Sequence, residues 1–183
     1  MPRLPFPADT AAFSDETRAA VCKIQETRGS LPPPSTYLAY AGDVADKLAA
    51  LAGHLRYQTS LTDAETELAI CAAARAMNAD YIWGAHVRLG LAAGTREEAI
   101  HAVDTFGPLD GLTDDEATII RYSRELLEDK QVTDATFEAV RARWGEKGAL
   151  ELTATMSVYL MNATILRAVD HQPPPDARHL TPR

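Results

Sequence analysis

The chain has 183 residues, enough for one domain with a proper core. Its formal net charge of -8 argues against a general affinity for nucleic acid or for an anionic membrane surface. Hydrophobic residues make up 46% of the chain, as in an ordinary soluble globular protein, and no run of about 18 apolar residues predicts a membrane span. The N-terminal sequence has no apolar core of a signal peptide. We therefore expect a cytoplasmic protein without nucleic-acid or membrane partners.

Helix start and stop signals divide most of the chain into helices. Gly29 and Gly145 follow amphipathic runs, and three Thr-x-x-Glu sequences, beginning at Thr62, Thr95 and Thr113, fit the capping box. No segment has the pattern of a β-strand, so the sequence predicts an all-α fold, a single-domain helical bundle of about eight helices. The predicted helices cover residues 15–28, 36–57, 63–77, 79–92, 96–105, 114–130, 134–144 and 147–168.

The last predicted helix, residues 147–168, is apolar on most of its sides. Such a helix lies either in the core or at a subunit interface. We expect one domain over residues 1–183 with its core at about 14–170. Residues 1–12 and 172–183 are predicted to be extended or loosely ordered tails, the second of them rich in proline and able to dock on a neighbour.

An acid, two aromatic residues and a histidine come together in the middle of the chain. Glu67 lies on the predicted helix 63–77, and Tyr81, Trp83 and His86 lie on the next one, after a short link. Ile82 and His86 share a helix face. A carboxylate beside an imidazole is an acid–base device, and a phenol can donate to a developing oxyanion. We predict that Glu67 approaches His86 and that Tyr81 and Trp83 wall an apolar pocket.

A purely structural role for the same residues stays open at this point. A histidine on a helix face is more often a packed or surface residue than a catalyst, and a buried glutamate is usually paired for stability. The two cysteines, Cys22 and Cys71, form no Cys-x-x-Cys pair, and the five histidines have no metal-ligand spacing. The sequence therefore predicts no metal and no cofactor, and the cysteines are interpreted as small buried hydrophobes.

The segment that contains Glu67 and His86 resembles the carboxymuconolactone decarboxylase / alkylhydroperoxidase D-like family. In the peroxidase branch a Glu precedes Cys-x-Tyr-Cys-x-x-x-His; here Glu67 and His86 match, but Ala79 and Ile82 occupy the cysteine positions. Asp-Tyr-Ile-Trp-x-x-His is instead similar to the cysteine-free decarboxylase-like branch, with Asp80 in place of its usual Glu. Peroxide reduction needs a thiolate and a resolving thiol, which these positions do not supply.

Flanking segments extend the resemblance over roughly residues 25–170. Residues 28–31 look like the family's loop before the core, residues 55–61 like its lead into the core helix, and residues 132–162 like the C-terminal half of longer members. The resemblance implies an all-helical fold that assembles as trimers or hexamers, with sites at or near subunit interfaces.

The resemblance also implies a cofactor-free carboxy-lyase that acts on a small carboxylated, lactone-type metabolite. In this hypothesis His86 protonates carbon, Glu67 orients it and Tyr81 donates to the oxyanion. Arg56 is a candidate to bind the substrate carboxylate, although a solvated surface arginine is the favoured alternative. Trp83 and Ile82 would line the substrate pocket.

Two other hypotheses remain. The chain could be a non-catalytic, oligomeric small-molecule-binding member of the family, in which the Glu–His pair only stabilises the core. A weaker hypothesis is a thiol peroxidase that uses Cys71. An open pocket lined by Glu67, Tyr81 and His86 would favour the enzyme. If Glu67 and His86 are sealed and mutually satisfied with no cavity, the lyase hypothesis fails.

Overall fold

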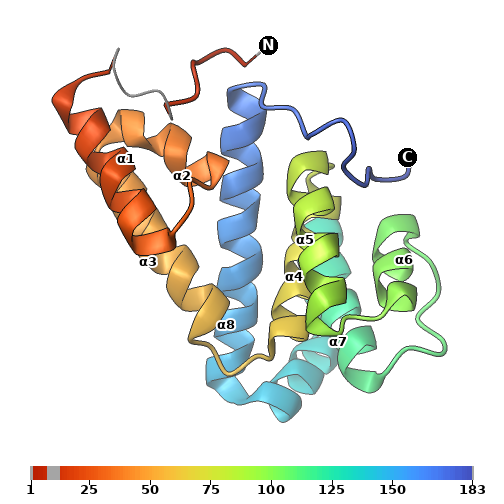
Figure 1. The fold of residues 1–183 in the computed structure, drawn as a ribbon. Helices are drawn as coiled ribbons and strands as arrows, with labels where there is room; N and C mark the ends of the chain where they lie inside the picture. Colours follow the sequence, from red (N-terminus) through yellow and green to blue (C-terminus); the bar gives the residue numbers. More distant parts are fainter. Residues whose placement is uncertain (1, 8–12, 183) are drawn as a thin grey trace.

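The computed structural model describes residues 2–7 and 13–182, and within them it has eight α-helices and no strand (Figure 1). The predicted all-α class is therefore confirmed. A short 3₁₀ helix, η2, and a π-helical turn, η3, complete the elements. In chain order they are α1 Asp15–Arg28, α2 Pro33–Leu38, η2 Ala39–Ala41, α3 Asp43–Tyr57, α4 Asp63–Ala76, α5 Asp80–Ala93, α6 Glu97–Thr105, α7 Asp114–Ser123, η3 Arg124–Asp129 and α8 Asp134–Ala168.

Side-chain caps explain where several helices begin. Thr62 and Thr113 form the predicted capping boxes at the starts of α4 and α7, because each hydroxyl accepts from a backbone N–H three residues on. The third predicted box is wrong. The Thr95 hydroxyl donates to the carbonyl of Ala64 at 3.0 Å, and α6 begins without a side-chain cap after Arg96. The Thr95 hydroxyl therefore bonds to α4 and, contrary to the prediction from the local sequence pattern, does not cap α6.

The predicted helix over residues 36–57 is in fact two helices. Gly42 has a φ of 55°, in the left-handed region that favours glycine, and it separates η2 from the start of α3. Pro33 and Pro34 lie in the first turn of α2, where a missing N–H costs nothing. The predicted break at Gly145 is confirmed, because its φ of 70° and ψ of 179° interrupt α8.

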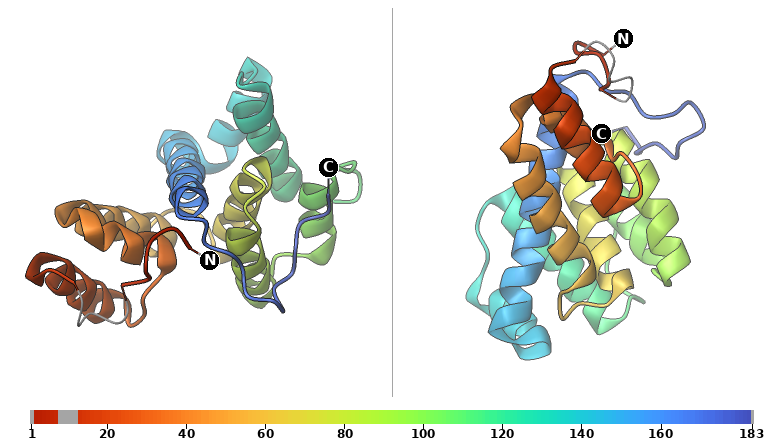
Figure 2. Two further views of the ribbon diagram at one scale, coloured as in Figure 1. Left: turned by 90° about the horizontal axis from the view of Figure 1, so that it is seen from above. Right: turned by 60° about the vertical axis from the view of Figure 1, so that its left-hand side comes forward.

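The most buried helix is α4. Every residue from Thr66 to Arg75 is buried, and α4 packs against α5, α6, α7 and α8. Viewed from above, α8 stands between α1–α3 on one side and α4–α7 on the other (Figure 2). Unlike α4, α8 leaves Leu150 67% and Met161 42% exposed, so the apolar helix predicted for the core or for a subunit interface is partly buried and partly at the surface.

Within the described residues, α8 is the one helix long and apolar enough to cross a membrane by length and composition. About half of its most apolar stretch, 56%, is buried inside the protein. Contacts with α4 and α7 account for that burial, as expected for a helix that packs into a protein core.

Residues 171–182, which we call the C-terminal strap, leave the end of α8, cross α5 and end beside α6 (Figures 1 and 2). Leu180 N–H donates to Asp80 Oδ1 at 3.0 Å, and Thr181 donates to Asp104 through N–H and hydroxyl at 2.9 and 2.7 Å. The sequence predicted an extended or loosely ordered C-terminal tail; the strap has no helix or strand, and it docks on its own chain. Of the predicted tails, residues 1, 8–12 and 183 lie outside the described part.

Candidate active site

Glu67 and His86 are in direct contact, as predicted from the sequence. His86 Nδ1 lies 2.7 Å from Glu67 Oε2, and a carboxylate can only accept, so the ring donates its Nδ1–H. Gly90, one turn after His86, permits this approach of α5 to α4. A Cβ at Gly90 would lie 3.3 Å from the Glu67 Cβ and 3.1 Å from the Thr95 hydroxyl.

Two further side chains complete what we call the Glu67 cluster: Arg56, Glu67, His86 and Tyr159. Arg56 Nη2 donates to Glu67 Oε1, and Arg56 Nη1 donates to the Tyr159 hydroxyl at 3.3 Å. The Tyr159 ring stands edge-on to the His86 ring, with centroids 4.8 Å apart. Helices α3, α4, α5 and α8 thus supply one residue each. The Arg56 side chain is only 13% exposed, so the favoured alternative of a solvated surface arginine is wrong.

The electrostatics of the cluster set the protonation of His86. Burial lowers the pKa of His86, and the hydrogen bond to Glu67 offsets this only in part. Burial also acts to lower the pKa of Arg56, but Tyr159 and Glu67 outweigh it and the net direction is upward. A charged Arg56 and the carboxyl group of Glu67 therefore flank a neutral imidazole. With its proton on Nδ1, this imidazole carries its lone pair on Nε2 and acts first as a base.

Tyr81 does not join the cluster. It precedes His86 by five residues and so points to another side of α5. Its ring lies edge-on to His171, with centroids 4.8 Å apart, and burial raises its pKa. The prediction that Tyr81 shares a pocket with His86 is wrong, and Tyr159 is the phenol beside the imidazole.

Trp83 and Ile82 are core residues rather than pocket walls. Trp83 is completely buried and Ile82 is 3% exposed, and both belong to the main hydrophobic cluster. Neither side chain can line an open substrate pocket in this chain, so their predicted substrate contact is corrected. Their burial instead fixes the rotation of α5, which turns His86 towards Glu67.

Tyr159 was missed because it lies far from the central motif in sequence. A signal was nevertheless present within the apolar α8. Buried polar residues recur on it at intervals of four, four and three residues, the spacing of one helix face. A polar stripe inside an apolar helix indicates a buried polar partner on the facing helix. These residues are Glu151, Thr155, Tyr159 and Asn162.

The cysteines are poorly placed for thiol chemistry. Cys71 lies one turn after Glu67 but is completely buried, and burial raises the pKa of its thiol. Cys22 is exposed on α1, so the interpretation of both cysteines as buried is correct only for Cys71. Among the described residues no group of three His, Cys, Asp or Glu side chains is arranged to hold a metal ion.

None of five cavities found among the described residues is the predicted open pocket lined by Glu67, Tyr81 and His86. The largest, about 640 Å³, lies between α5 and the C-terminal strap, and Tyr81 is its only predicted site residue. The side chains of Glu67 and His86 are 5% and 10% exposed. The pair is therefore nearly closed in a single chain.

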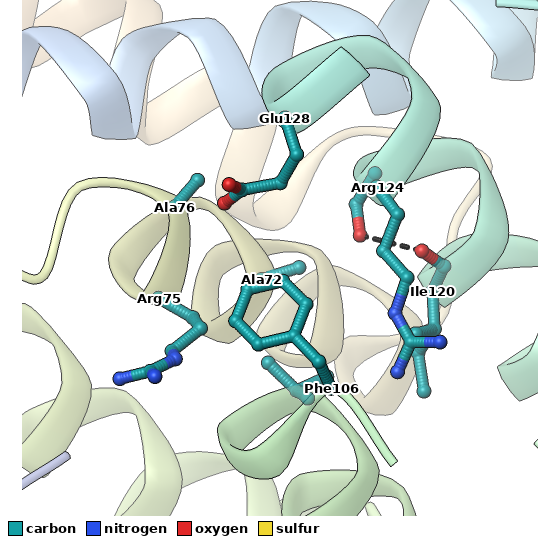
Figure 3. Close-up of a pocket in the computed structure, with 9 residues that line it drawn as sticks. Ala72, Arg75, Ala76, Phe106, Ile120, Arg124 and Glu128 are labelled. Atoms are coloured by element: carbon teal, nitrogen blue, oxygen red, sulfur yellow. Dashed lines mark hydrogen bonds between the residues drawn. The ribbon is translucent and has the colours of Figure 1, made fainter. Parts of the chain in front are cut away.

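Another cavity, shown in Figure 3, is too small for a substrate. Its volume of about 10 Å³ is at the limit for one water molecule. The guanidinium carbons of Arg75 and Arg124 lie 5.3 and 5.8 Å from the ring centre of Phe106, and Arg124 also donates to the carbonyls of Ala102 and Gly107. These contacts hold the end of α6 and assign this cavity a structural role.

Residues 42–107 match a family model described as "Carboxymuconolactone decarboxylase family". Over this segment the chain is similar to the carboxymuconolactone decarboxylase family. It runs from α3 to α6 and contains three members of the Glu67 cluster, whereas Tyr159 of α8 lies outside it. A comparison with curated proteins found no match.

Solved structures confirm the alkylhydroperoxidase D-like fold over nearly the whole chain. An uncharacterised peroxidase-related protein from Ralstonia eutropha JMP134, described as an alkylhydroperoxidase AhpD core, has a TM-score of 0.73 at 20% identity, over 96% of this chain and 93% of that one. A peroxidase-related protein from Silicibacter sp. TM1040 has a TM-score of 0.72 at 15% identity over the same shares. The debrominase Bmp8 in complex with 2,3,4-tribromopyrrole has a TM-score of 0.70 at 13% identity, over 88% and 87%.

Proposed function

We propose that this protein is a cofactor-free acid–base enzyme in which His86 carries the proton and Glu67 positions it. The observation that supports this most is the hydrogen bond from His86 Nδ1 to Glu67 Oε2. It directs the remaining ring nitrogen, Nε2, for which the structure gives no hydrogen bond within the described residues, towards a reacting group. A positioned histidine contributes about 10²–10⁴-fold to proton-transfer steps.

The proposed reaction is the loss of carbon dioxide from a small carboxylated, lactone-type metabolite. The electron pair of the broken C–C bond stays on the substrate and is delocalised into an adjacent carbonyl. His86 Nε2 takes up a proton from substrate or water and delivers it to that carbon. Arg56 and Tyr159 lie where they would stabilise the developing negative charge. Arg56 Nε is buried with no hydrogen-bond partner among the described residues, so a substrate oxygen would satisfy it.

The proposal includes a homo-oligomer, a trimer or hexamer, in the cytoplasm. Leu150 and Met161 on α8 are exposed apolar side chains that a subunit contact would bury. Access to the nearly closed Glu67 cluster would then depend on the assembled protein. The exposed edges of Arg56 and His86, 13% and 10% of their side chains, mark the side from which a substrate would approach.

One observation favours a second candidate function, an oligomeric small-molecule-binding protein without catalysis. None of the five cavities reaches the Glu67 cluster, and Glu67 is satisfied by Arg56 and His86. In that case the cluster holds four helices together and a ligand binds elsewhere. The thiol peroxidase hypothesis has lost its support, because Cys71 is completely buried with a raised pKa.

A decarboxylation assay separates the two candidates. We would measure carbon dioxide release from a panel of small lactone and keto acids with the wild type, His86→Gln and the matched control His101→Gln, whose side chain is exposed on α6. The enzyme proposal expects kcat to fall at least about 10²-fold in His86→Gln with Tm nearly unchanged, and His101→Gln to match the wild type. Equal turnover by His86→Gln and the wild type would contradict it. Binding of panel compounds without turnover would favour the binding protein.

A further inference from the structure

We propose that the cavity between α5 and the C-terminal strap is a binding site for a small organic anion with an apolar body. This site is separate from the Glu67 cluster and does not depend on the acid–base function. Its volume of about 640 Å³ is within the usual range of small-molecule sites.

The cavity lies on the face of α5 opposite to His86. Tyr81, Gly84, Arg88 and Leu91 line it, and their spacing of three, four and three residues defines one helix face. His86 lies two residues from both Gly84 and Arg88, about 200° around the helix from each. A ligand in this cavity therefore contacts a different side of α5 from a substrate at Nε2.

The roof of the cavity is a segment fixed at both of its ends. At its start, His171 Nδ1 is 3.1 Å from the Tyr37 hydroxyl. At its far end, Arg178 pairs with Glu97 at 2.6 Å, and residues 180–181 are hydrogen-bonded to Asp80 and Asp104. Between these ends, residues 173–175 are prolines, which have no N–H to satisfy and a restricted φ. Such a segment can span the helix without collapsing onto it.

Gly84 determines how closely the strap approaches α5. A Cβ at this position would lie 2.9 Å from the carbonyl oxygen of Arg178 and 3.1 Å from the Cβ of Ala177. The strap therefore rests directly on the α5 backbone at Gly84. The cavity is a defined space beside a close contact and not a loose gap under a tail.

The lining residues indicate the chemistry of the ligand. Arg88 is exposed and makes no ion pair or hydrogen bond with the other described residues, whereas Arg178 is already paired with Glu97. A carboxylate can pair with a guanidinium through two parallel hydrogen bonds. Asp176 is the one acid in the lining, and it faces two arginines, Arg88 and Arg178, so the lining has a net positive charge. The apolar wall, suited to a ring or short hydrocarbon body, is formed by Tyr81, Ala85, Val87, Leu91, Pro174 and Ala177.

Calorimetric titration of the full chain with 2-naphthoate tests the proposal, with neutral 2-naphthamide as the matched ligand control. We expect 2-naphthoate to bind and Arg88→Gln to weaken it at least about tenfold, since a hydrogen bond to a charged group is lost. Arg121→Gln, at another exposed arginine on α7, is the matched protein control and should leave the affinity unchanged. The amide should bind the wild type at least about tenfold more weakly than the acid.

Several outcomes would overturn the proposal. One is the absence of binding, and another is equal affinity of Arg88→Gln and the wild type. A third is that Arg56→Gln loses binding while Arg88→Gln keeps it, which would place the ligand at the Glu67 cluster. Leu91→Gln should weaken the binding of 2-naphthoate, and the molecular mass of the protein measured by sedimentation should stay unchanged. A lower mass in this variant would show that a second copy of the chain covers this face.

Discussion

The two faces of α5 differ in what they offer a ligand: one carries an acid–base pair without a cavity, and the other lines a cavity without such a pair. The face towards α4 carries His86 in contact with Glu67, but the pair is nearly closed. The outer face has the largest of the five cavities, and its exposed Arg88 makes no ion pair with the other described residues. Each face also has a glycine at a close contact, Gly90 towards α4 and Gly84 towards the strap.

A single helix thus separates two kinds of site. On the inner face burial fixes the proton geometry, because a low dielectric strengthens the contacts between charged and polar groups. On the outer face the strap leaves room for a ligand but builds no proton relay. Substitutions on the two faces test whether charge pairing stabilises the inner face and whether the strap keeps a cavity open on the outer face.

The largest effect is expected from removing the central charge of the inner face. Glu67→Ala leaves Arg56 and His86 without their carboxylate partner inside the protein. Loss of one partner from a buried ion pair costs about 3–5 kcal/mol, so the free energy of unfolding should fall by that amount. Denaturant unfolding measures it. A change below about 1 kcal/mol would show that the cluster is solvated in solution.

Truncation of apolar side chains should distinguish the two faces clearly. Ile82→Ala opens a cavity at a position that is 3% exposed, and we expect a loss of about 2–5 kcal/mol. Leu91→Ala, at a side chain that is 41% exposed, should change stability by no more than about 0.5 kcal/mol. Equal losses in the two variants would contradict the assignment of inner and outer faces.

A methyl group at Gly84 tests the contact between strap and helix. Gly84→Ala places a Cβ 2.9 Å from the Arg178 carbonyl oxygen, and the strap has to shift. We expect a loss of about 1 kcal/mol, in the lower range for overpacking. Amide hydrogen exchange of Leu180 and Thr181 should accelerate as the strap loosens. Unchanged exchange would show that these amides are held independently of the Gly84 contact.

The smallest effect is expected in the pH dependence of folding stability. The pKa of His86 in the folded protein lies below its ordinary value of 6.5, so the unfolded chain takes up this proton first as the pH falls. The stability from neutral His86 is complete above about pH 6.5 and is lost as the pH drops towards the folded pKa. The loss of stability between pH 7 and 5 should be smaller in His86→Gln. Burial also lowers the pKa of the half-buried His171, so His171→Gln should have a weaker effect of the same sign.

Much of the fold and half of the Glu67 cluster could be predicted from local patterns. Capping boxes at Thr62 and Thr113 fixed two helix starts, because a cap involves neighbours in sequence. The spacing from Glu67 to His86 across a short link identified their contact. The burial of Arg56 could not be predicted, because it depends on how α3 meets α4.

The errors have a common physical origin in tertiary contacts. Thr95 has a capping sequence, yet its hydroxyl bonds to α4. Tyr81 was assigned to the site by proximity in sequence, whereas the rotation of α5 gives that place to Tyr159 of α8. The place where the strap docks could likewise not be predicted from its own sequence, because its anchors are Asp80 and Asp104 on distant helices. Local sequence specifies the elements, and the partners of their polar groups follow only from packing.

The protonation of the two ring nitrogens of His86 is the most direct test of the central claim. Nitrogen NMR of histidine-labelled protein near pH 7 should show a protonated Nδ1 and an unprotonated Nε2, with His86 assigned by its absence in His86→Gln. Glu67→Gln should disturb this state, because the amide replaces the charged acceptor. A ring protonated on both nitrogens at pH 7, or one with its proton on Nε2, would contradict the claim that Glu67 holds a neutral His86 as a base.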